Sequence, residues 1–247
     1  MTPVFWRWLG RVPFAETARL QERLREAVIR NEGPETALFA EHDPVITLGR
    51  SAEAAHVLAG SGELTHRGIE LATVSRGGAA TYHGPGQLVG YPIMRLRGGV
   101  LGHLTGMARA VATVLAGLGV QADWRRDAPG LWVGDAKICA FGVHVRHRVA
   151  MHGFALNVNG PLAGFDLIVP CGRPGAKTIS LVQALGTAVS PPPLHVLAAR
   201  VASAMGDALG VVMQPAVERS ADPAFVRDAG APNDIEMSNG ITTMIEA

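Results

Sequence analysis

Apolar residues recur at helical spacing in four segments of the chain. The first covers residues 14–31, where an apolar stripe is expected to face the core and charged side chains lie opposite. Gly33 and Pro34 follow directly and end this helix. The same spacing predicts further helices over residues 101–118, 178–185, with Thr178 as its N-cap, and 194–209.

Short runs rich in β-branched and aromatic residues, bounded by Gly, Pro and Asp, predict the strands. They cover residues 36–41, 45–48, 69–75, 87–96, 130–133, 136–145 and 149–158. Gly134-Asp135, between two of these runs, is typical of a hairpin turn. Because strands come in runs with helices interspersed, the pattern predicts an α+β fold, with a mixed, mainly antiparallel sheet packed against helices.

Residues 1–214 contain no internal repeat and no linker, so we expect a single domain there. The remaining residues, 215–247, are rich in Ala, Asp, Pro and Ser and show no periodicity. Such a composition is typical of a disordered tail.

Composition and charge exclude several classes of protein. Hydrophobic residues make up 48 % of the chain and charged residues 17 %, which is typical of a globular protein. A formal net charge of +1 disfavours a nucleic-acid partner. The apolar N-terminal segment is interrupted by Arg7 and Arg11, unlike a signal peptide, and the apolar run 107–120 is too short to span a bilayer. We therefore expect a cytoplasmic protein without a membrane partner.

Lysine is rare in this chain. Lys137 and Lys177 are the only lysines among 22 basic residues, and the others are arginine. Arginine stays protonated, whereas a lysine amine can release its proton when its pKa is depressed, so a retained lysine indicates a need for the amine itself. Strand alternation places Lys137 on the same face as Cys139. The alternative is an edge-strand lysine that prevents aggregation.

The two cysteines, Cys139 and Cys171, are too few for a disulfide framework. Cys171 stands between Pro170 and Gly172, in a turn that can hold a thiol at the mouth of a cleft; an inert, buried thiol is the alternative. A nucleophilic thiol needs a cation or base beside it. Besides lysine, the candidates are His83, His144, His147 and His152. Alternation puts the two closest of these histidines on opposite strand faces, so no metal site is expected.

The segment RGGAATYHGPGQ, residues 76–87, is rich in glycine. Its backbone can approach a ligand closely and direct several N–H groups toward it. The spacing matches neither a P-loop nor a dinucleotide-binding fingerprint. The alternative is an ordinary glycine-rich turn that joins two strands.

Five blocks of the sequence occur in a characteristic order: HDPVITLGR (42–50), RGGAATYHGPGQLVGYPI (76–93), DAPGLWVGDAKICAFGVHVRH (127–147), MHGFALNVN (151–159) and FDLIVPCG (165–172). Together they resemble the lipoyl(octanoyl) transferase family. The resemblance implies the fold of biotin and lipoate protein ligases. It also implies transfer of an octanoyl group from octanoyl-acyl carrier protein to a lysine of lipoyl-domain proteins, such as 2-oxoacid dehydrogenase E2 subunits and glycine cleavage H protein. No cofactor and a monomeric enzyme are expected.

The resemblance also assigns roles to residues. Cys171 is the implied nucleophile, which forms an acyl thioester, and Lys137 is its activator. We expect Cys139 to be structural, and Lys177 receives no role. The implied acyl-pocket residues are Arg76, Gly77, Gly78, Ala79, Ala80, Thr81, Tyr82, His83, Ala140, Phe141, Gly142, Gly153, Phe154 and Ala155.

Two other functions are compatible with the same fold. One is an ATP-dependent lipoate or biotin protein ligase, which would not depend on Cys171. The other is a non-enzymatic acyl-binding protein, against which the presence of both Lys137 and Cys171 argues. A cysteine hydrolase is a third possibility, which would release free octanoate.

Overall fold

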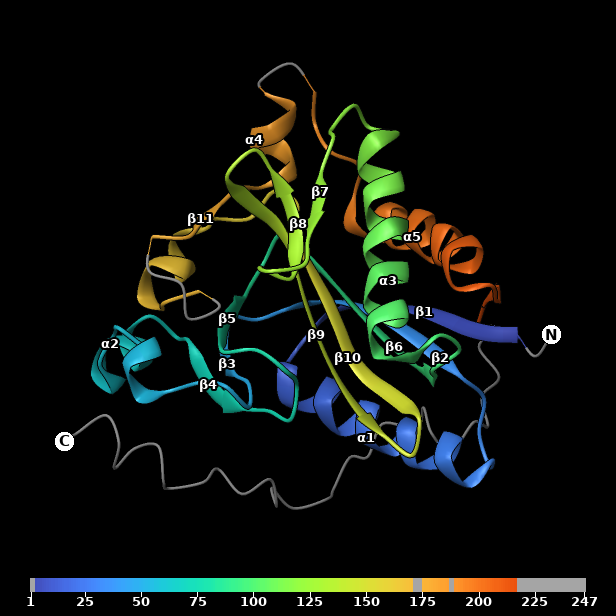
Figure 1. Ribbon diagram of the computed structural model, residues 1–247. Helices are drawn as coiled ribbons and strands as arrows, with labels where there is room; N and C mark the ends of the chain where they lie inside the picture. Colours follow the sequence, from blue (N-terminus) through green and yellow to red (C-terminus); the bar gives the residue numbers. More distant parts are fainter. Residues whose placement is uncertain (1–2, 171–174, 187–188, 217–247) are drawn as a thin grey trace.

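The computed structural model describes residues 3–170, 175–186 and 189–216 (Figure 1). The expected nucleophile Cys171 and most of the expected tail lie outside these ranges. The expected domain boundary at residue 214 falls within the last described strand, β12 (Val212–Pro215), which pairs with β1.

The main sheet of the described chain has nine strands. Eight follow the order β12-β1-β2-β6-β10-β9-β8-β7, and β11 pairs with β9. The strands not yet given are β1 (Pro3–Val12), β2 (Thr36–His42), β6 (Gln87–Arg95), β7 (Asp123–Arg125), β8 (Gly130–Val133), β9 (Ala136–Arg146), β10 (Val149–Asn157) and β11 (Lys177–Thr178). β1 runs parallel to β2 and β12, and β11 runs parallel to β9, whereas the other pairs are antiparallel. The mixed, mainly antiparallel sheet expected from the sequence is confirmed.

A second sheet of three strands lies beside the main one (Figure 1). Its order is β4 (Glu70–Thr73), β3 (Val45–Leu48) and β5 (Ala80–His83). The short helix α2 (Ser61–His66) packs next to it. Because β5 continues through a tight turn into β6, this small sheet is held against the centre of the main one.

Helices cover both faces of the main sheet (Figure 1). α1 (Phe14–Arg30) packs on one face against β6 and β10, with Leu24 and Val28 in a buried cluster. α3 (Gly99–Ala116) and α5 (Leu194–Leu209) pack on each other and on the opposite face, where they form the larger core cluster. Since both faces are covered, every residue of β10 is buried.

α3 is the one helix of the described residues that is long and apolar enough to cross a membrane, by length and composition alone. It begins at Gly99, earlier than the apolar run considered in the sequence, and so reaches 18 residues. One stripe of it, including Met107 and Val111, is buried in the larger core cluster against α5 and the sheet. This packing accounts for its apolar character.

Two sequence predictions of local structure are wrong. Thr178 does not begin a helix, because residues 177 and 178 form β11 beside β9. The helix is α4 (Leu181–Leu185), and its N-cap is Ser180 in a capping box with Gln183. The segment 76–87 is not only a loop, since Ala80–His83 forms strand β5. The sequence patterns did not predict β1, β7, β12 or α2. Strands β7 and β12 are the edges of the main sheet, β1 is next to β12, and α2 lies beside the small sheet.

His103 of α3 is a buried titratable group that lines a cavity together with Arg97 and Leu209. Its side chain is 3 % exposed, and its Nε2 atom has no hydrogen-bond partner among the described residues. Burial, together with the nearby Arg97 guanidinium, lowers the pKa of His103 to about 4. The folded state therefore resists a proton that the unfolded chain accepts below pH 6.5, and stability falls as the pH drops from 6.5 toward 4.

We expect the substitution His103→Leu to stabilise the protein more at pH 5 than at pH 7. The difference between the two pH values should be about 2 kcal/mol in the free energy of unfolding, because leucine removes the linked protonation. Urea unfolding at both pH values measures it. The exposed His195 provides the control, since His195→Leu should leave the pH dependence as it is. Equal effects of His103→Leu at both pH values would contradict the expectation.

Candidate active site

An inner cavity lies between the glycine-rich segment 76–81 and strands β9 and β10. It encloses about 560 Å³ of empty space, the open mouth included, which is in the range of small-molecule sites. Its walls include these residues expected from the sequence: Arg76, Gly77, Gly78, Ala79, Ala80, Thr81, His83, Ala140, Phe141, Gly142, Gly153, Phe154 and Ala155. Phe14, Thr47, Val74, Val89, Tyr91 and His152 complete the lining. Segments far apart in the sequence therefore meet around one cavity.

Small residues on neighbouring strands make room for the inner cavity. Gly142 lies opposite Gly153, and Ala140 lies opposite Ala155, in the antiparallel pairing of β9 and β10. A Cβ atom on Gly142 would lie 2.9 Å from the backbone oxygen of Gly77, and one on Gly153 would lie 2.2 Å from a backbone oxygen of β6. These positions require glycine because the backbones on either side approach so closely.

The polar side chains in the walls are bound to other protein groups. Nη2 of Arg76 donates to the backbone oxygen of Thr47 (2.6 Å) and to its Oγ1 (2.9 Å). The hydroxyl of Tyr91 and Nε2 of His42 form a hydrogen bond of 2.7 Å. Because these polar atoms form hydrogen bonds within the protein, the surface of the cavity is mostly apolar. Such a surface suits an alkyl chain, which binds by burying its apolar surface area.

His83 is a neutral histidine in the wall of the inner cavity. Burial, followed by the nearby His42 and Arg76, lowers its pKa to about 3. Nδ1 of His83 lies 3.2 Å from Oε1 of Gln87, whose Nε2 donates to the backbone oxygen of Tyr82 and to Oδ1 of Asn157. This pattern assigns the imidazole proton to Nδ1 and leaves Nε2 as an acceptor.

Tyr82 does not line the inner cavity, contrary to the sequence prediction. Strand alternation in β5 turns Thr81 and His83 toward the cavity and Tyr82 to the opposite side. There its ring packs edge-on against Phe165, with ring centroids 5.7 Å apart. Burial raises the pKa of the Tyr82 hydroxyl. Tyr82 is a core residue of the small sheet.

A second cavity, the lysine cavity, adjoins the inner cavity and shares three wall residues with it, Thr81, Ala140 and Ala155. Its other wall residues are Trp132, Lys137, Asn157, Phe165, Pro170, Ala176, Lys177 and Thr178. Pro170 directly precedes Cys171 in the sequence. The two cavities together therefore connect the expected acyl pocket with the expected catalytic lysine and with the segment that carries the cysteine.

Lys137 is buried in the lysine cavity, with 8 % of its surface exposed. Its Nζ donates to the backbone oxygen of Pro129 (3.3 Å) and lies 4.9 Å from the centre of the Trp132 ring. Gly130 leaves the space for the aliphatic stem, since a Cβ atom there would lie 2.8 Å from Cε of Lys137. Lys137 is therefore held in one place by its surroundings, unlike an edge-strand lysine that extends into solvent.

A β-bulge separates Lys137 from Cys139, which were expected on the same strand face. Trp132 pairs with Lys137 and Leu131 pairs with Cys139, so that Ile138 has no partner on β8. Ile138 and Cys139 both belong to the larger core cluster, whereas Lys137 lies in a cavity with Ala140. Cys139 has no exposed surface, and burial raises the pKa of its thiol well above its usual value. These features are those of a structural cysteine.

The histidines considered as bases lie away from the lysine cavity. His83 and His152 line the inner cavity, His144 lines neither cavity, and His147 lies in the turn between β9 and β10. Among the described residues, Lys137 is thus the titratable group that is buried in the lysine cavity. No group of three or more His, Cys, Asp or Glu side chains suited to a metal ion occurs in this part of the chain.

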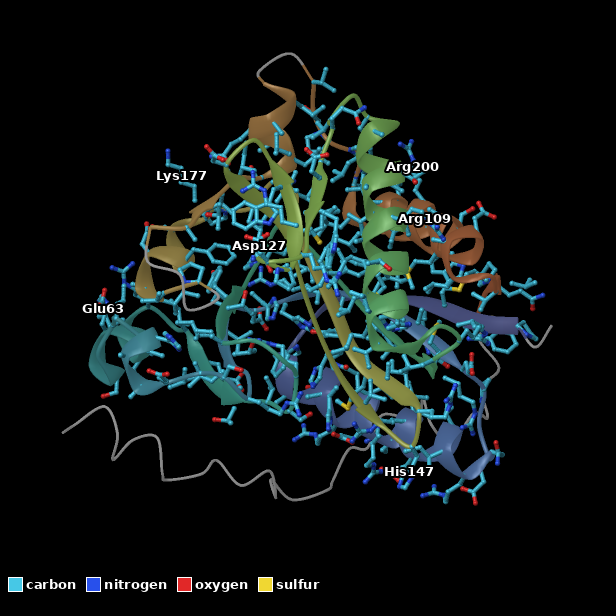
Figure 2. All side chains as sticks on the ribbon, in the orientation of Figure 1. Glu63, Arg109, Asp127, His147, Lys177 and Arg200 are labelled. Atoms are coloured by element: carbon cyan, nitrogen blue, oxygen red, sulfur yellow. The ribbon has the colours of Figure 1, made fainter. Side chains whose placement is uncertain are left out.

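Lys177 borders the same cavity but differs from Lys137. It is exposed, and its side chain projects from β11 toward the outside of the molecule (Figure 2). Its backbone partner on β9 is Ala136, next to Lys137. The two lysines of the chain are therefore neighbours across paired strands, one enclosed and one at the rim.

A family model, described as the lipoyl protein ligase A/B catalytic domain, matches residues 13–203. The chain belongs to this family. An octanoyltransferase from Chloroflexus aurantiacus is 41 % identical over 217 residues, which cover 85 % of this chain and 95 % of that relative. An octanoyltransferase from Acidobacterium capsulatum is 42 % identical over 189 residues, which cover 70 % and 77 %, respectively.

The fold also agrees with this family. A bipartite lipoate protein ligase from Thermoplasma acidophilum superposes with a TM-score of 0.68 at 17 % identity, covering 87 % of each chain. The expected α+β fold of the ligase type is confirmed. The family match extends from the start of α1 into α5 and includes both cavities, so the site described here lies within the shared catalytic domain.

Several wall residues were not singled out from the sequence. Trp132 and Asn157 lie in the lysine cavity, and Tyr91 lies in the wall of the inner cavity. All three stand inside the blocks that carry the family resemblance, which was the available signal. Thr178 stands outside those blocks, and only the pairing of β11 with β9 brings it to the cavity.

Proposed function

We propose that this protein transfers an octanoyl group from octanoyl-acyl carrier protein to a lysine of lipoyl-domain proteins, through an acyl thioester on Cys171. The observation that carries the proposal is the position of Lys137, a buried amine in a cavity that shares three wall residues with the mostly apolar inner cavity and borders Pro170. Octanoyltransferase relatives above 40 % identity over most of the chain support the reaction.

In the first step, the Cys171 thiolate attacks the thioester carbonyl of the donor. The bond between the acyl carbon and the pantetheine sulfur breaks, and that sulfur takes a proton from the ammonium of Lys137. One thioester replaces another, so this step needs no ATP. The alkyl chain occupies the inner cavity, where burial of its area contributes the binding energy.

In the second step, the amine of the acceptor lysine attacks the Cys171 thioester. The bond between the acyl carbon and Cys171 breaks as the amide forms, and the neutral amine of Lys137 takes the proton from the attacking nitrogen. The pair returns to its starting state of thiolate and ammonium. Since an amide is more stable than a thioester, this step drives the reaction to product.

The proposal is tested by supplying the acyl group in two forms. We expect octanoyl-acyl carrier protein without ATP to give an octanoylated lipoyl domain, detected by intact mass, whereas free octanoate with ATP should give none. A lipoyl domain whose target lysine is replaced by arginine is the control for amide formation. Product only with octanoate and ATP would indicate a ligase, and release of free octanoate without acceptor modification would indicate a hydrolase.

A further inference from the structure

Two hydrogen bonds cross the wall of the inner cavity beside His152, which lines this cavity and not the lysine cavity. One joins Oγ of Ser75 and Nε2 of His152 (3.3 Å), and in the other the backbone N–H of Gly77 donates to the oxygen of Val143 (3.0 Å). Both connect the glycine-rich segment, from β4 to β5, with the paired strands β9 and β10. His152 lines the cavity at this point, and its partner on β9 is Val143.

The length of the cavity follows from the strand that forms its wall. Ala155 borders both cavities, and His152 lies three residues further along β10, a distance of about 10 Å in a strand. In the proposed reaction the thioester lies near Lys137, so the methyl end of the chain points along β10 toward His152. This span suits an acyl chain of medium length.

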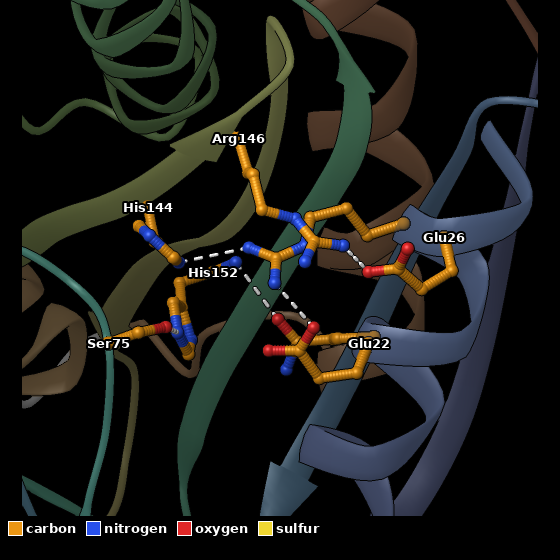
Figure 3. A network of polar contacts seen from close by, with 8 residues as sticks. Glu22, Glu26, Ser75, His144, Arg146 and His152 are labelled. Carbon is orange, nitrogen blue, oxygen red and sulfur yellow. Dashed lines mark hydrogen bonds and ion pairs between the residues drawn. The ribbon is translucent and has the colours of Figure 1, made fainter. Parts of the chain in front are cut away.

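His152 adjoins a network of polar side chains that joins α1 to strands β9 and β10 (Figure 3). Oε1 of Gln21 accepts a hydrogen bond from the backbone N–H of His152 (2.9 Å). Arg25, which is 3 % exposed, forms an ion pair with Glu22 and a hydrogen bond with His144. A chain that reached past His152 would have to separate the buried side chains of Gln21 and Arg25 from their polar partners, which is unfavourable.

The backbone of His152 reinforces its position. Its φ of 59° lies in the left-handed region, which histidine, asparagine and glycine tolerate better than most residues. The contacts of its side chain with Ser75 and of its N–H with Gln21 hold this conformation within a strand. The imidazole is thereby fixed across the end of the cavity.

We propose that His152, held by Ser75 and Gln21, is the stop that sets the longest acyl chain the protein accepts. This inference rests on the proposed octanoyl transfer and adds to it the residue that determines chain-length selectivity. The side chain of His152 occupies the space that the last atoms of a longer acyl chain would need, and it takes no part in proton transfer.

The test compares acyl-enzyme formation from octanoyl-, decanoyl- and dodecanoyl-acyl carrier protein, measured by intact mass over time. The wild type should discriminate against the longer chains, since a misplaced methylene costs about tenfold or more in rate. His152→Gly should raise the rate for dodecanoyl relative to octanoyl by at least about tenfold. Glycine also adopts the left-handed backbone conformation without strain, so the variant should still fold.

Two further variants make the result decisive. His152→Asn, which also tolerates the left-handed backbone, should give a smaller shift toward longer chains because it leaves a smaller space. His144→Ala is the matched control, a histidine of the same polar network that does not line the cavity, and its chain-length profile should equal that of the wild type.

The outcomes separate the two proposals. If the wild type forms an octanoyl-enzyme and the folded His152→Gly and His152→Asn variants keep its chain-length profile, the stop is overturned while octanoyl transfer stands. If His144→Ala shifts the profile as much as His152→Gly does, the network as a whole and not His152 sets the length, and the inference is likewise overturned. If the wild type forms no acyl-enzyme with any chain, the proposed function itself fails.

Discussion

Replacing Cys171 by alanine is expected to abolish octanoyl transfer, with a loss on the order of 10⁴-fold or more, as for other covalent nucleophiles. Without the thiol, the acceptor lysine would have to attack the carrier thioester directly, with no acyl-enzyme to divide the reaction into two steps. Intact-mass analysis after incubation with octanoyl-acyl carrier protein should show an octanoyl addition on the wild type and none on Cys171→Ala.

The second cysteine supplies a matched control for this experiment. Cys139 is fully buried in the larger core cluster, and burial raises the pKa of its thiol, so it offers no accessible thiolate. Cys139→Ala should therefore keep both the acyl addition and the transfer activity, with at most a loss of stability from the smaller side chain. An octanoyl group found on Cys139, or an active Cys171→Ala variant, would refute the assignment of the nucleophile.

Replacing Lys137 by arginine should reduce transfer by about 10²–10⁴-fold, the usual contribution of a positioned acid or base. Arginine retains the positive charge but does not release a proton at neutral pH, so it can hold a thiolate without serving as acid or base. The planar guanidinium is also larger than the amine, and the close approach of Gly130 to the stem of Lys137 leaves little room for it.

Rapid-mixing measurements of the two half-reactions will locate this defect. Both acyl-enzyme formation and transfer to the lipoyl domain should slow in Lys137→Arg, because the proposed lysine acts in each. Lys177→Arg makes the same chemical change at the exposed lysine of the cavity rim and should retain near wild-type rates. A fully active Lys137→Arg variant would show that charge alone suffices and would remove the acid–base role.

Much of the fold follows from local patterns. Helix α5 was predicted with its observed limits, and α1 and α3 to within a few residues, because each carries an apolar stripe at helical spacing that the core must cover. The central strands β6, β9 and β10 were predicted because they are apolar runs between turn residues. β12, an edge strand, and its neighbour β1 were not, because their pairing joins opposite ends of the described chain and has no local signal.

The residues of the site, like the elements of the fold, were predicted in part from the sequence. Composition pointed to the two lysines, since a rare lysine stands out among arginines, and the ordered sequence blocks selected Lys137 and brought it together with the glycine-rich segment and Cys171. The family resemblance also named most wall residues of the inner cavity, and the pairing of β9 with β10 brings their small residues opposite one another.

Only the tertiary structure decided which way the key side chains face. Alternation predicts Lys137 and Cys139 on one side, but the bulge opposite β8 places Lys137 in a cavity and Cys139 in the core. The position of His152 in the wall of the inner cavity likewise depends on contacts with Ser75 and Gln21, which come from distant parts of the chain. Periodicity describes a strand by itself, whereas bulges and cavity ends arise from the segments packed against it.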